Sequence, residues 1–511
     1  MIRAIGLAAA LAAGAANAQP APPSVRPPPA QAPQTDDSAL DFVSAPIQEV
    51  SSTTRHTATV NGRKVDYTAV AGTLTLRDDA GTATASMFYV AYLLEPNDAR
   101  RPVTFFYNGG PGSSSMWLHM ASFGPRRVVI DTPHMSANAP HRLVDNDATV
   151  LTKTDIVFLD AINTGYSRPL GDTKPEAFLT ADADIDAFTK GIMRFLTVHQ
   201  RWNSPKYLFG ESYGTSRSAG VAARLQAEGA QLNGLIQLGS ILDIARILAE
   251  GDAMYKSVLP TYAMTAAYHG RIAKPQDQAV FIREVTDWVE GPYSVALAKG
   301  DALPSQERRQ LAEQMSKYIG LPASYLVEQN LRVTPDEFRA QLLHDQGEVI
   351  GELDTRFTAL EVNGKADEPS FDPSASGVFR PIIATFQTYV RDELNFKTPM
   401  VYRRAFAGAF PKFDFRRTNG AGLAQYGPDL AVAMKINPNL KVLSFNGLYD
   451  LSTAFYGAQL DYAHLGLPAQ FLPNIRQLYY GSGHMAYVDG PVARSMSQEM
   501  QRFYDETAPA R

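Results

Sequence analysis

One serine of this chain has the sequence surroundings of an activated nucleophile. Ser212 lies between two glycines in G-E-S-Y-G, residues 210–214. A strand-like run, KYLF, precedes this turn, and an Ala-rich helical sequence follows it at 216–228. Strand, sharp turn and helix form the setting of a nucleophile elbow, in which glycines allow the turn and let helix and strand pack closely. We therefore predict a nucleophilic Ser212 and favour the elbow over an ordinary glycine-rich turn.

Such a serine needs a general base, and an acid that orients the base. His484 lies in the glycine-rich stretch YYGSGHMAYVDG, directly after the last strand-like run, where an α/β sheet presents reactive groups. Asp450 follows a strand and a turn in KVLSFNGLYD, with room for one helix and one strand before His484. The order Ser, Asp, His is that of α/β hydrolases. We predict that Ser212, Asp450 and His484 form a catalytic triad.

Other candidates fit less well. Asp461 lies in a helical pattern and is expected to face solvent, and Asp489 comes after the histidine. His344 and His464 lie in helical patterns and are expected to be solvated or packed. His134 and His141 lie in a Pro-containing loop without metal-ligand spacing and are expected at the surface.

An oxyanion hole requires two backbone amides, one of them from the residue after the nucleophile, here Tyr213. The other amide is expected from FFYNGGPGSSS, residues 105–115, which follows a strand and is rich in glycine. This loop lacks the Gly-Lys-Ser/Thr ending of a phosphate-binding loop, although a simple hairpin turn stays an alternative.

The elements around these residues predict an α/β fold. Short, nearly unbroken apolar runs are typical of strands that are buried on both faces of a parallel sheet; they occur at 103–108, 155–160, 206–210, 235–239, 441–447 and 476–481. The segment 182–199 has the apolar spacing of an amphipathic helix, and the segments 64–78 and 82–95 alternate like antiparallel strands. Strands alternating with helices indicate a mostly parallel central sheet covered by helices.

The N-terminus reads as an export signal. Arg3, a short apolar run and Ala16-Asn17-Ala18 predict a signal peptide over 1–18, cleaved near Ala18. The organisation that we expect is a signal peptide at 1–18, a Pro-rich linker at 19–40, a first core part at 41–250, a helical insertion at 251–393 and a second core part at 394–511. No later run reaches the roughly 18 apolar residues of a membrane span. We therefore expect a secreted or periplasmic protein.

Composition excludes several classes of function. The chain has no cysteine, so disulfides and catalytic thiols are excluded. Its formal net charge is −5 and it has no basic stripe, which argues against nucleic acid as a partner.

Several segments together resemble the serine carboxypeptidase family, the S10 peptidases of the α/β-hydrolase fold. NGGPGSSS at 108–115 looks like the family's N-G-G-P-G-C-S-S loop, and LDAINTGYSRP at 159–169 is similar to L-D-x-P-x-G-x-G-F-S-Y. GESYG, NGLYD and GHM match the serine, acid and histidine motifs. LPTYAMTAAYHG at 259–270 is similar to bacterial S10-like proteins. The resemblance covers about 100–250 and 380–505.

The resemblance implies roles for further residues. The amides of Gly110 and Tyr213 would form the oxyanion hole, and Asn108 and Glu211 would hold the terminal carboxylate of a peptide. Ionised, Glu211 would oppose that carboxylate. Protonated, it would donate a hydrogen bond to it, and burial beside the nucleophile would raise its pKa accordingly.

Three positions depart from the family pattern. Ser113 replaces its usual cysteine, and Ser122 stands where many members carry a second glutamate, which thins the carboxylate-binding network. Tyr487 and its neighbours replace the proline that usually follows GHM, so the pocket shape is expected to differ.

The sequence thus predicts a serine-type carboxypeptidase acting on peptides with a free C-terminus, without metal or organic cofactor. An esterase or acyltransferase using the same triad is the main alternative, and a catalytically silent binding protein is a second one. The oligomeric state and the preferred C-terminal residues are not predicted.

Overall fold

The computed structural model describes residues 43–249, 251–363, 368–406, 408–417 and 423–508. The expected signal peptide and the whole of the expected Pro-rich linker lie outside these residues. Among the helices that are described, none is both long enough and apolar enough to cross a membrane.

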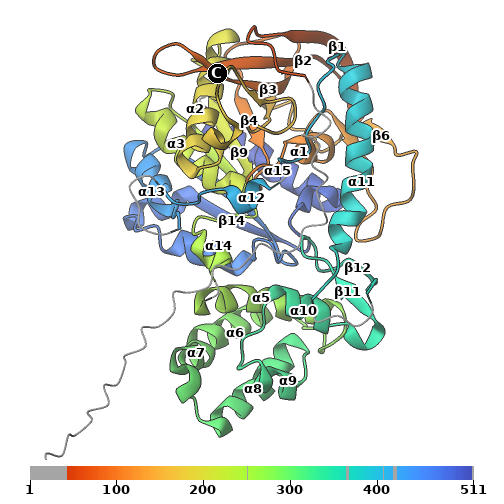
Figure 1. Ribbon diagram of the computed structural model, residues 1–511, viewed down its shortest axis with the longest axis vertical. Helices are drawn as coiled ribbons and strands as arrows, with labels where there is room; N and C mark the ends of the chain where they lie inside the picture. The colour runs from red at the N-terminus through yellow and green to blue at the C-terminus, as the bar shows by residue number, and fades with distance from the viewer. Residues whose placement is uncertain (1–42, 250, 364–367, 407, 418–422, 509–511) are drawn as a thin grey trace, which may run out of the picture.

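One large sheet forms the centre of the described chain (Figure 1). Its strands are β1 (Ser51–Val60), β2 (Arg63–Arg77), β3 (Ala83–Leu94), β4 (Val103–Tyr107), β7 (Asp155–Leu159), β8 (Arg168–Pro169), β9 (Lys206–Glu211), β10 (Gly234–Leu238), β13 (Lys441–Gly447) and β14 (Ile475–Tyr480). The strand order is β1-β2-β3-β7-β4-β9-β10-β13-β14, with β8 paired to β3. From β7 to β14 neighbouring strands are parallel, whereas β1, β2 and β3 form an antiparallel edge.

Two short hairpins and the helices complete the fold. The hairpins are β5 (Arg126–Val128) with β6 (Leu143–Asp145), and β11 (Glu348–Ile350) with β12 (Thr358–Leu360). The α-helices are α1 (Met116–Ala121), α2 (Ala181–Val198), α3 (Tyr213–Ala227), α4 (Ala245–Leu248), α5 (Asp252–Tyr268), α6 (Gln278–Trp288), α7 (Ser294–Lys299), α8 (Ser305–Ile319), α9 (Ala323–Glu328), α10 (Pro335–Gln341), α11 (Pro373–Thr388), α12 (Ala409–Lys412), α13 (Gly427–Ile436), α14 (Phe455–Ala463) and α15 (Gly490–Thr507).

Helices cover both faces of the sheet, which explains the apolar runs of its central strands. Side chains of a strand alternate between faces. Phe106 accordingly packs in a core with α1, α11 and α15, while its neighbours Phe105 and Tyr107 pack in a second core with α2, α3 and α13. All residues of β4, β7, β9 and β10 are buried. The predicted mostly parallel, helix-covered sheet is confirmed.

The interval 251–393 contains most of the remaining helices. Helices α5 to α10 gather at one end of the sheet, shown in green in Figure 1, around an apolar cluster of their own. That cluster also takes in Leu448, Leu451 and Phe455, which follow β13. Helix α11 instead runs along the main body. Its residues Val378 and Ile382 belong to the core that contains Phe106. The domain boundaries themselves stay a prediction.

Candidate active site

The turn around Ser212 has the geometry of an elbow. Ser212 is the residue between β9 and α3, and its φ of 59° lies in the left-handed region that L-residues seldom adopt. Its backbone N–H donates to the Leu238 carbonyl at the end of β10. A Cβ on Gly210 would lie 2.2 Å from the Gly214 carbonyl oxygen, so a larger residue there would push the helix off the strand.

The structure brings the predicted acid and base together. Nδ1 of His484 lies 2.8 Å from Oδ2 of Asp450, a carboxylate that is fully buried. Asp450 also accepts hydrogen bonds from the N–H and the hydroxyl of Thr453, at 2.9 and 2.7 Å. With Nδ1–H directed at Asp450, Nε2 of a neutral His484 is the nitrogen able to take a proton.

The charge around His484 favours its protonated form. Burial opposes the imidazolium, but the charge and hydrogen bond of Asp450, aided by Glu211 and Glu352, outweigh burial and raise the pKa of His484 to about 9. These anions stabilise the imidazolium that forms when a serine gives up its proton. Because Glu211 contributes through its charge, the pKa of His484 falls again when Glu211 is protonated.

Gly239 lies between the histidine and the elbow. A Cβ there would meet Thr453 Oγ1 at 2.6 Å and His484 Nδ1 at 3.1 Å, so the imidazole packs directly on this backbone. Gly239 follows Leu238, the residue that accepts from Ser212 N–H. Within the described part of the chain the Ser212 hydroxyl is not hydrogen-bonded to His484. Such contacts often tighten only with substrate bound.

The loop after β4 passes over the first amides of α3. A Cβ on Gly109 would lie 2.5 Å from the amide nitrogen of Tyr213 and 2.7 Å from that of Gly214. Gly110 follows with a φ of +104°. The two amides predicted to bind an oxyanion, those of Gly110 and Tyr213, therefore come from adjoining segments. Gly109 is a requirement of this site that sequence reasoning missed.

Glu211 and Asn108 are in direct contact. Asn108 Nδ2 donates to Glu211 Oε2 at 2.8 Å, and Asn108 Oδ1 accepts from the Leu118 N–H at 3.1 Å, which fixes the orientation of the amide. Tyr487 adds a third member, because its hydroxyl donates to the same Oε2 at 2.9 Å. Sequence comparison indicated only that Tyr487 replaces a proline; its contact with Glu211 was missed.

Burial raises the pKa of Glu211 to about 7. The His484 charge and the hydrogen bonds from Tyr487 and Asn108 lower that pKa, while the Asp450 charge raises it, and burial prevails. The carboxyl thus gains and loses its proton near neutral pH. This agrees with the upward shift that we expected for Glu211.

Ser122 lies beside this network without joining it. Its hydroxyl donates to the Leu118 carbonyl at 2.5 Å, at the end of α1, and its own carbonyl accepts from Asn146. The expected thinning of the carboxylate-binding network at this position stays a prediction.

A buried ion pair contacts the loop that follows β4. Arg217, fully buried on α3, donates to the Asn108 carbonyl at 2.7 Å and pairs with Asp184 of α2 through two nitrogens. Its guanidinium carbon lies 4.1 Å from the centre of the Phe188 ring. The sequence signal for this contact is a charged residue within an Ala-rich helical stretch.

The segment 351–357 of the expected insertion holds both triad loops. Its Leu353 carbonyl accepts from the His484 N–H at 2.6 Å, and its Thr355 N–H donates to the Tyr449 carbonyl, next to Asp450. Arg356 donates to the Gly481 carbonyl at 2.8 Å. The two loops of the core are thus braced by a segment more than 90 residues before them in the chain.

One expectation is wrong. Asp461 does not face solvent but is buried, where it accepts hydrogen bonds from the N–H groups of Leu242 and Asp243 and pairs with Arg246. The helical pattern of α14 favours an exposed Asp461. The N–H groups of Leu242 and Asp243 instead bind its carboxylate in the interior.

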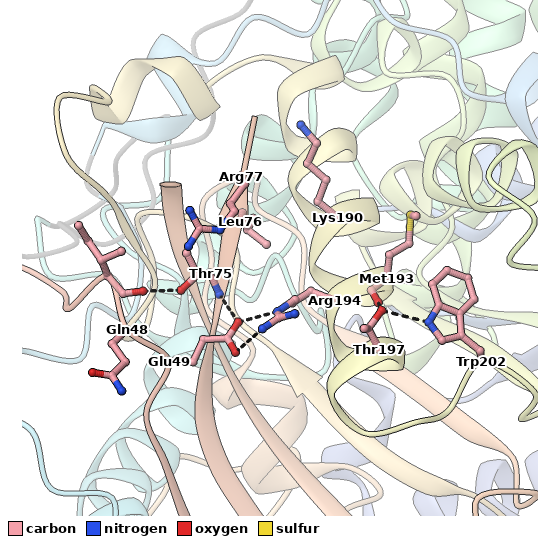
Figure 2. A pocket seen from close by; sticks show the side chains of 11 residues that line it. Gln48, Glu49, Thr75, Leu76, Arg77, Lys190, Met193, Arg194, Thr197 and Trp202 are labelled. Atoms are coloured by element: carbon pink, nitrogen blue, oxygen red, sulfur yellow. Dashed lines mark hydrogen bonds and ion pairs between the residues drawn. The ribbon is translucent and has the colours of Figure 1, made fainter. Parts of the chain in front are cut away.

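An open groove lies elsewhere, along the outer side of α2 (Figure 2). In it Arg194 reaches across to Glu49, which also accepts from the Thr75 N–H. The groove contains none of the predicted site residues. Its ion pair fastens the start of the described chain to α2.

Comparisons with known proteins agree with this architecture. Residues 61–279 match the family model Peptidase_S10, serine carboxypeptidase. The pheromone-processing carboxypeptidase KEX1 of Yarrowia lipolytica is 27% identical over 204 residues, 39% of this chain and 30% of the yeast protein. The match thus spans less than a third of that relative's length. The crystal structure of Kex1(Δ)p, a prohormone-processing carboxypeptidase from Saccharomyces cerevisiae, aligns with a TM-score of 0.52 at 14% identity, over 85% of this chain and 91% of that one.

The sheet, its flanking helices and the elbow define the α/β-hydrolase fold. Within this fold, residues 61–279 are similar to the serine carboxypeptidase family, peptidase S10, whose family model they match.

Proposed function

We propose that this protein is a serine-type carboxypeptidase that removes residues from the C-termini of peptides. The observation that carries the proposal is the position of Glu211. A buried carboxyl with a pKa of about 7, hydrogen-bonded to Asn108, directly precedes the elbow serine. A hydrolase that accepts any ester has no use for a protonatable acid there. An exopeptidase needs a donor for the free carboxylate of its substrate.

The chemistry follows from the triad. Ser212 Oγ attacks the last peptide carbonyl while His484 Nε2 takes its proton, and the oxygen turns anionic against the Gly110 and Tyr213 amides. The C–N bond then breaks as His484 returns the proton to the leaving amine. The peptide remains as an ester on Ser212. Water, deprotonated by His484, releases the shortened peptide.

Glu211 and Asn108 would act on the leaving residue. Below the pKa of Glu211, its neutral carboxyl and the Asn108 amide both donate to the substrate carboxylate. Above that pKa two carboxylates face each other, so KM should rise. Glu211→Gln keeps a donor at every pH and should flatten that rise, while leaving acylation largely intact.

An esterase or acyltransferase remains the main alternative, because the same triad serves those reactions. The test compares N-blocked dipeptides with their C-terminal amides and with acyl esters. The proposal predicts preference for the free acid, strongest below pH 7. A strong preference for amides or esters lacking the carboxylate would contradict it.

A catalytically silent binding protein is the second alternative. A fluorophosphonate should label Ser212 in the folded enzyme, and an intact protein without label would favour the silent alternative. We also propose export, to the periplasm or outside the cell, on the N-terminal sequence alone. Its test is the N-terminal residue of the exported protein, expected at Gln19.

A further inference from the structure

The two hydrogen bonds to Glu211 fall on one oxygen. Oε2 accepts from Asn108 Nδ2 at 2.8 Å and from the Tyr487 hydroxyl at 2.9 Å. Oε1 has no hydrogen-bond partner among the residues that the structure describes. A neutral carboxyl has one carbonyl oxygen, which accepts, and one hydroxyl oxygen, which donates. With two donors on Oε2, the proton of neutral Glu211 belongs on Oε1.

Tyr487 is placed to donate its hydroxyl proton to Glu211. The residue is fully buried in the short helical turn η8 (Ala486–Val488), three residues after His484. Burial, together with the Glu211 charge, raises the pKa of Tyr487 well above its ordinary value, so the phenol stays protonated. Its ring packs in the core that contains Phe106.

We propose that Tyr487 is a positioning residue of C-terminal recognition, whose phenol fixes Glu211 Oε2 and leaves Oε1 to meet the substrate carboxylate. This inference rests on the proposed function. It gives a role to the tyrosine that stands in place of the family's proline, in a network where Ser122 supplies no carboxyl. If Asn108 were its only donor, the carboxyl group of Glu211 would be free to rotate about its Cγ–Cδ bond.

Tyr487 also sets the pH range of recognition. The ionisable groups around Glu211 are His484 and Asp450 from the triad loops and Tyr487 from η8. The phenol stabilises the ionised carboxylate, so its removal should raise the pKa of Glu211. A hydrogen bond to a charged group corresponds to a shift of about one pH unit.

The experiment measures KM and kcat for an N-blocked dipeptide with a free C-terminus, from pH 5 to 9, in the parent and in Tyr487→Phe. Phenylalanine keeps the ring and removes only the hydroxyl. We expect KM at pH 5.5 to increase several-fold, the alkaline rise in KM to move up by about one pH unit, and kcat to change less than about threefold. In a Glu211→Gln background the same substitution should move no pH midpoint.

Tyr504→Phe is the matched control. Tyr504, on α15, is equally buried, and its hydroxyl is hydrogen-bonded to the hydroxyl of Thr104. It should leave the KM profile unchanged. If Tyr487→Phe leaves the KM profile like the parent's, or lowers kcat alone, the inference is wrong.

A protein that rejects peptides with a free carboxylate would contradict the proposed function separately. The Tyr487–Glu211 link is then decided by thermal unfolding. Tyr487→Phe should move the pH at which stability is lost upward, and an unmoved pH dependence would overturn the link.

Discussion

The backbone N–H of His484 donates to the carbonyl of Leu353 at 2.6 Å. This single bond connects the predicted catalytic base to the segment 351–357, which precedes β12 in the expected insertion. Arg356 of the same segment donates to the Gly481 carbonyl and the Ser482 hydroxyl, on the N-terminal side of the histidine. The segment 351–357 therefore holds the loop that carries the predicted base.

Arg356→Gln should lower kcat/KM by between about 10- and 100-fold, because the histidine loop loses its outer support and a small displacement of a catalytic group is costly. The measurement is kcat/KM against pH, with thermal unfolding alongside. Arg416→Gln is the control, since Arg416 also pairs with an aspartate two residues earlier but is exposed. A folded Arg356→Gln enzyme with the parent's rate would contradict the account.

Asp450→Asn should reduce kcat by on the order of 10³- to 10⁴-fold, because the imidazole loses both its orientation and the anion that stabilises its charge. Thr453→Val removes one hydrogen bond to Asp450 but keeps the charge, so its loss should be far smaller. Pre-steady-state acylation kinetics would separate this effect from binding. Equal losses in the two variants would show that Asp450 is not the orienting acid.

Glu211→Gln should stabilise the protein at high pH. The pKa of Glu211 is about 7 in the folded state and 4.5 as a free side chain. Folding therefore favours its protonated form, and the stability present below pH 4.5 is lost as pH rises through about 7. The ionised carboxyl costs about 3 kcal/mol at pH 8, since one pKa unit is about 1.36 kcal/mol.

Urea unfolding at pH 4.5 and pH 8 measures this effect. The Gln variant should match its parent at the lower pH and exceed it at the higher one. Glu313→Gln, at an exposed position of α8, should show no such difference. A Gln variant with the parent's loss of stability between the two values would mean that Glu211 does not titrate there.

Arg217→Met should destabilise the fold by roughly 3–5 kcal/mol, because Asp184 is left as an unpaired buried charge. The double variant Arg217→Met with Asp184→Leu should recover most of that stability. It should not recover kcat/KM, because the Asn108 carbonyl still lacks its partner. Full recovery of both would reduce the ion pair to a purely structural element.

The sequence was sufficient for the parts of this site that rest on local order. Gly210, Ser212 and Gly214 define a turn through their own backbone requirements, and strand-like runs before Asp450 and His484 place both at one edge of the sheet. The period of α2 and the alternation of β2 and β3 predicted these elements, and the structure confirms them.

Contacts between distant segments were not predictable in this way. Tyr487 meets Glu211 across 276 residues, and Leu353 meets His484 through a backbone carbonyl that carries no sequence signal. Asp461 was placed wrongly because helical period ignores the amides of Leu242 and Asp243. Local sequence motifs identify the reactive side chains. The residues that hold those side chains in place are set by packing between distant segments.

The most direct test of the central claim is a time course of peptide digestion followed by mass spectrometry. The substrate is a peptide of defined sequence, offered with a free C-terminus and with the same terminus amidated, at pH 5.5 and pH 8.5. The account predicts a ladder of single C-terminal losses from the free acid, with a preference over the amide that is larger at pH 5.5 than at pH 8.5, and no ladder in Ser212→Ala. Internal cleavage, equal attack on the amidated peptide, or a ladder that persists in Ser212→Ala would contradict it.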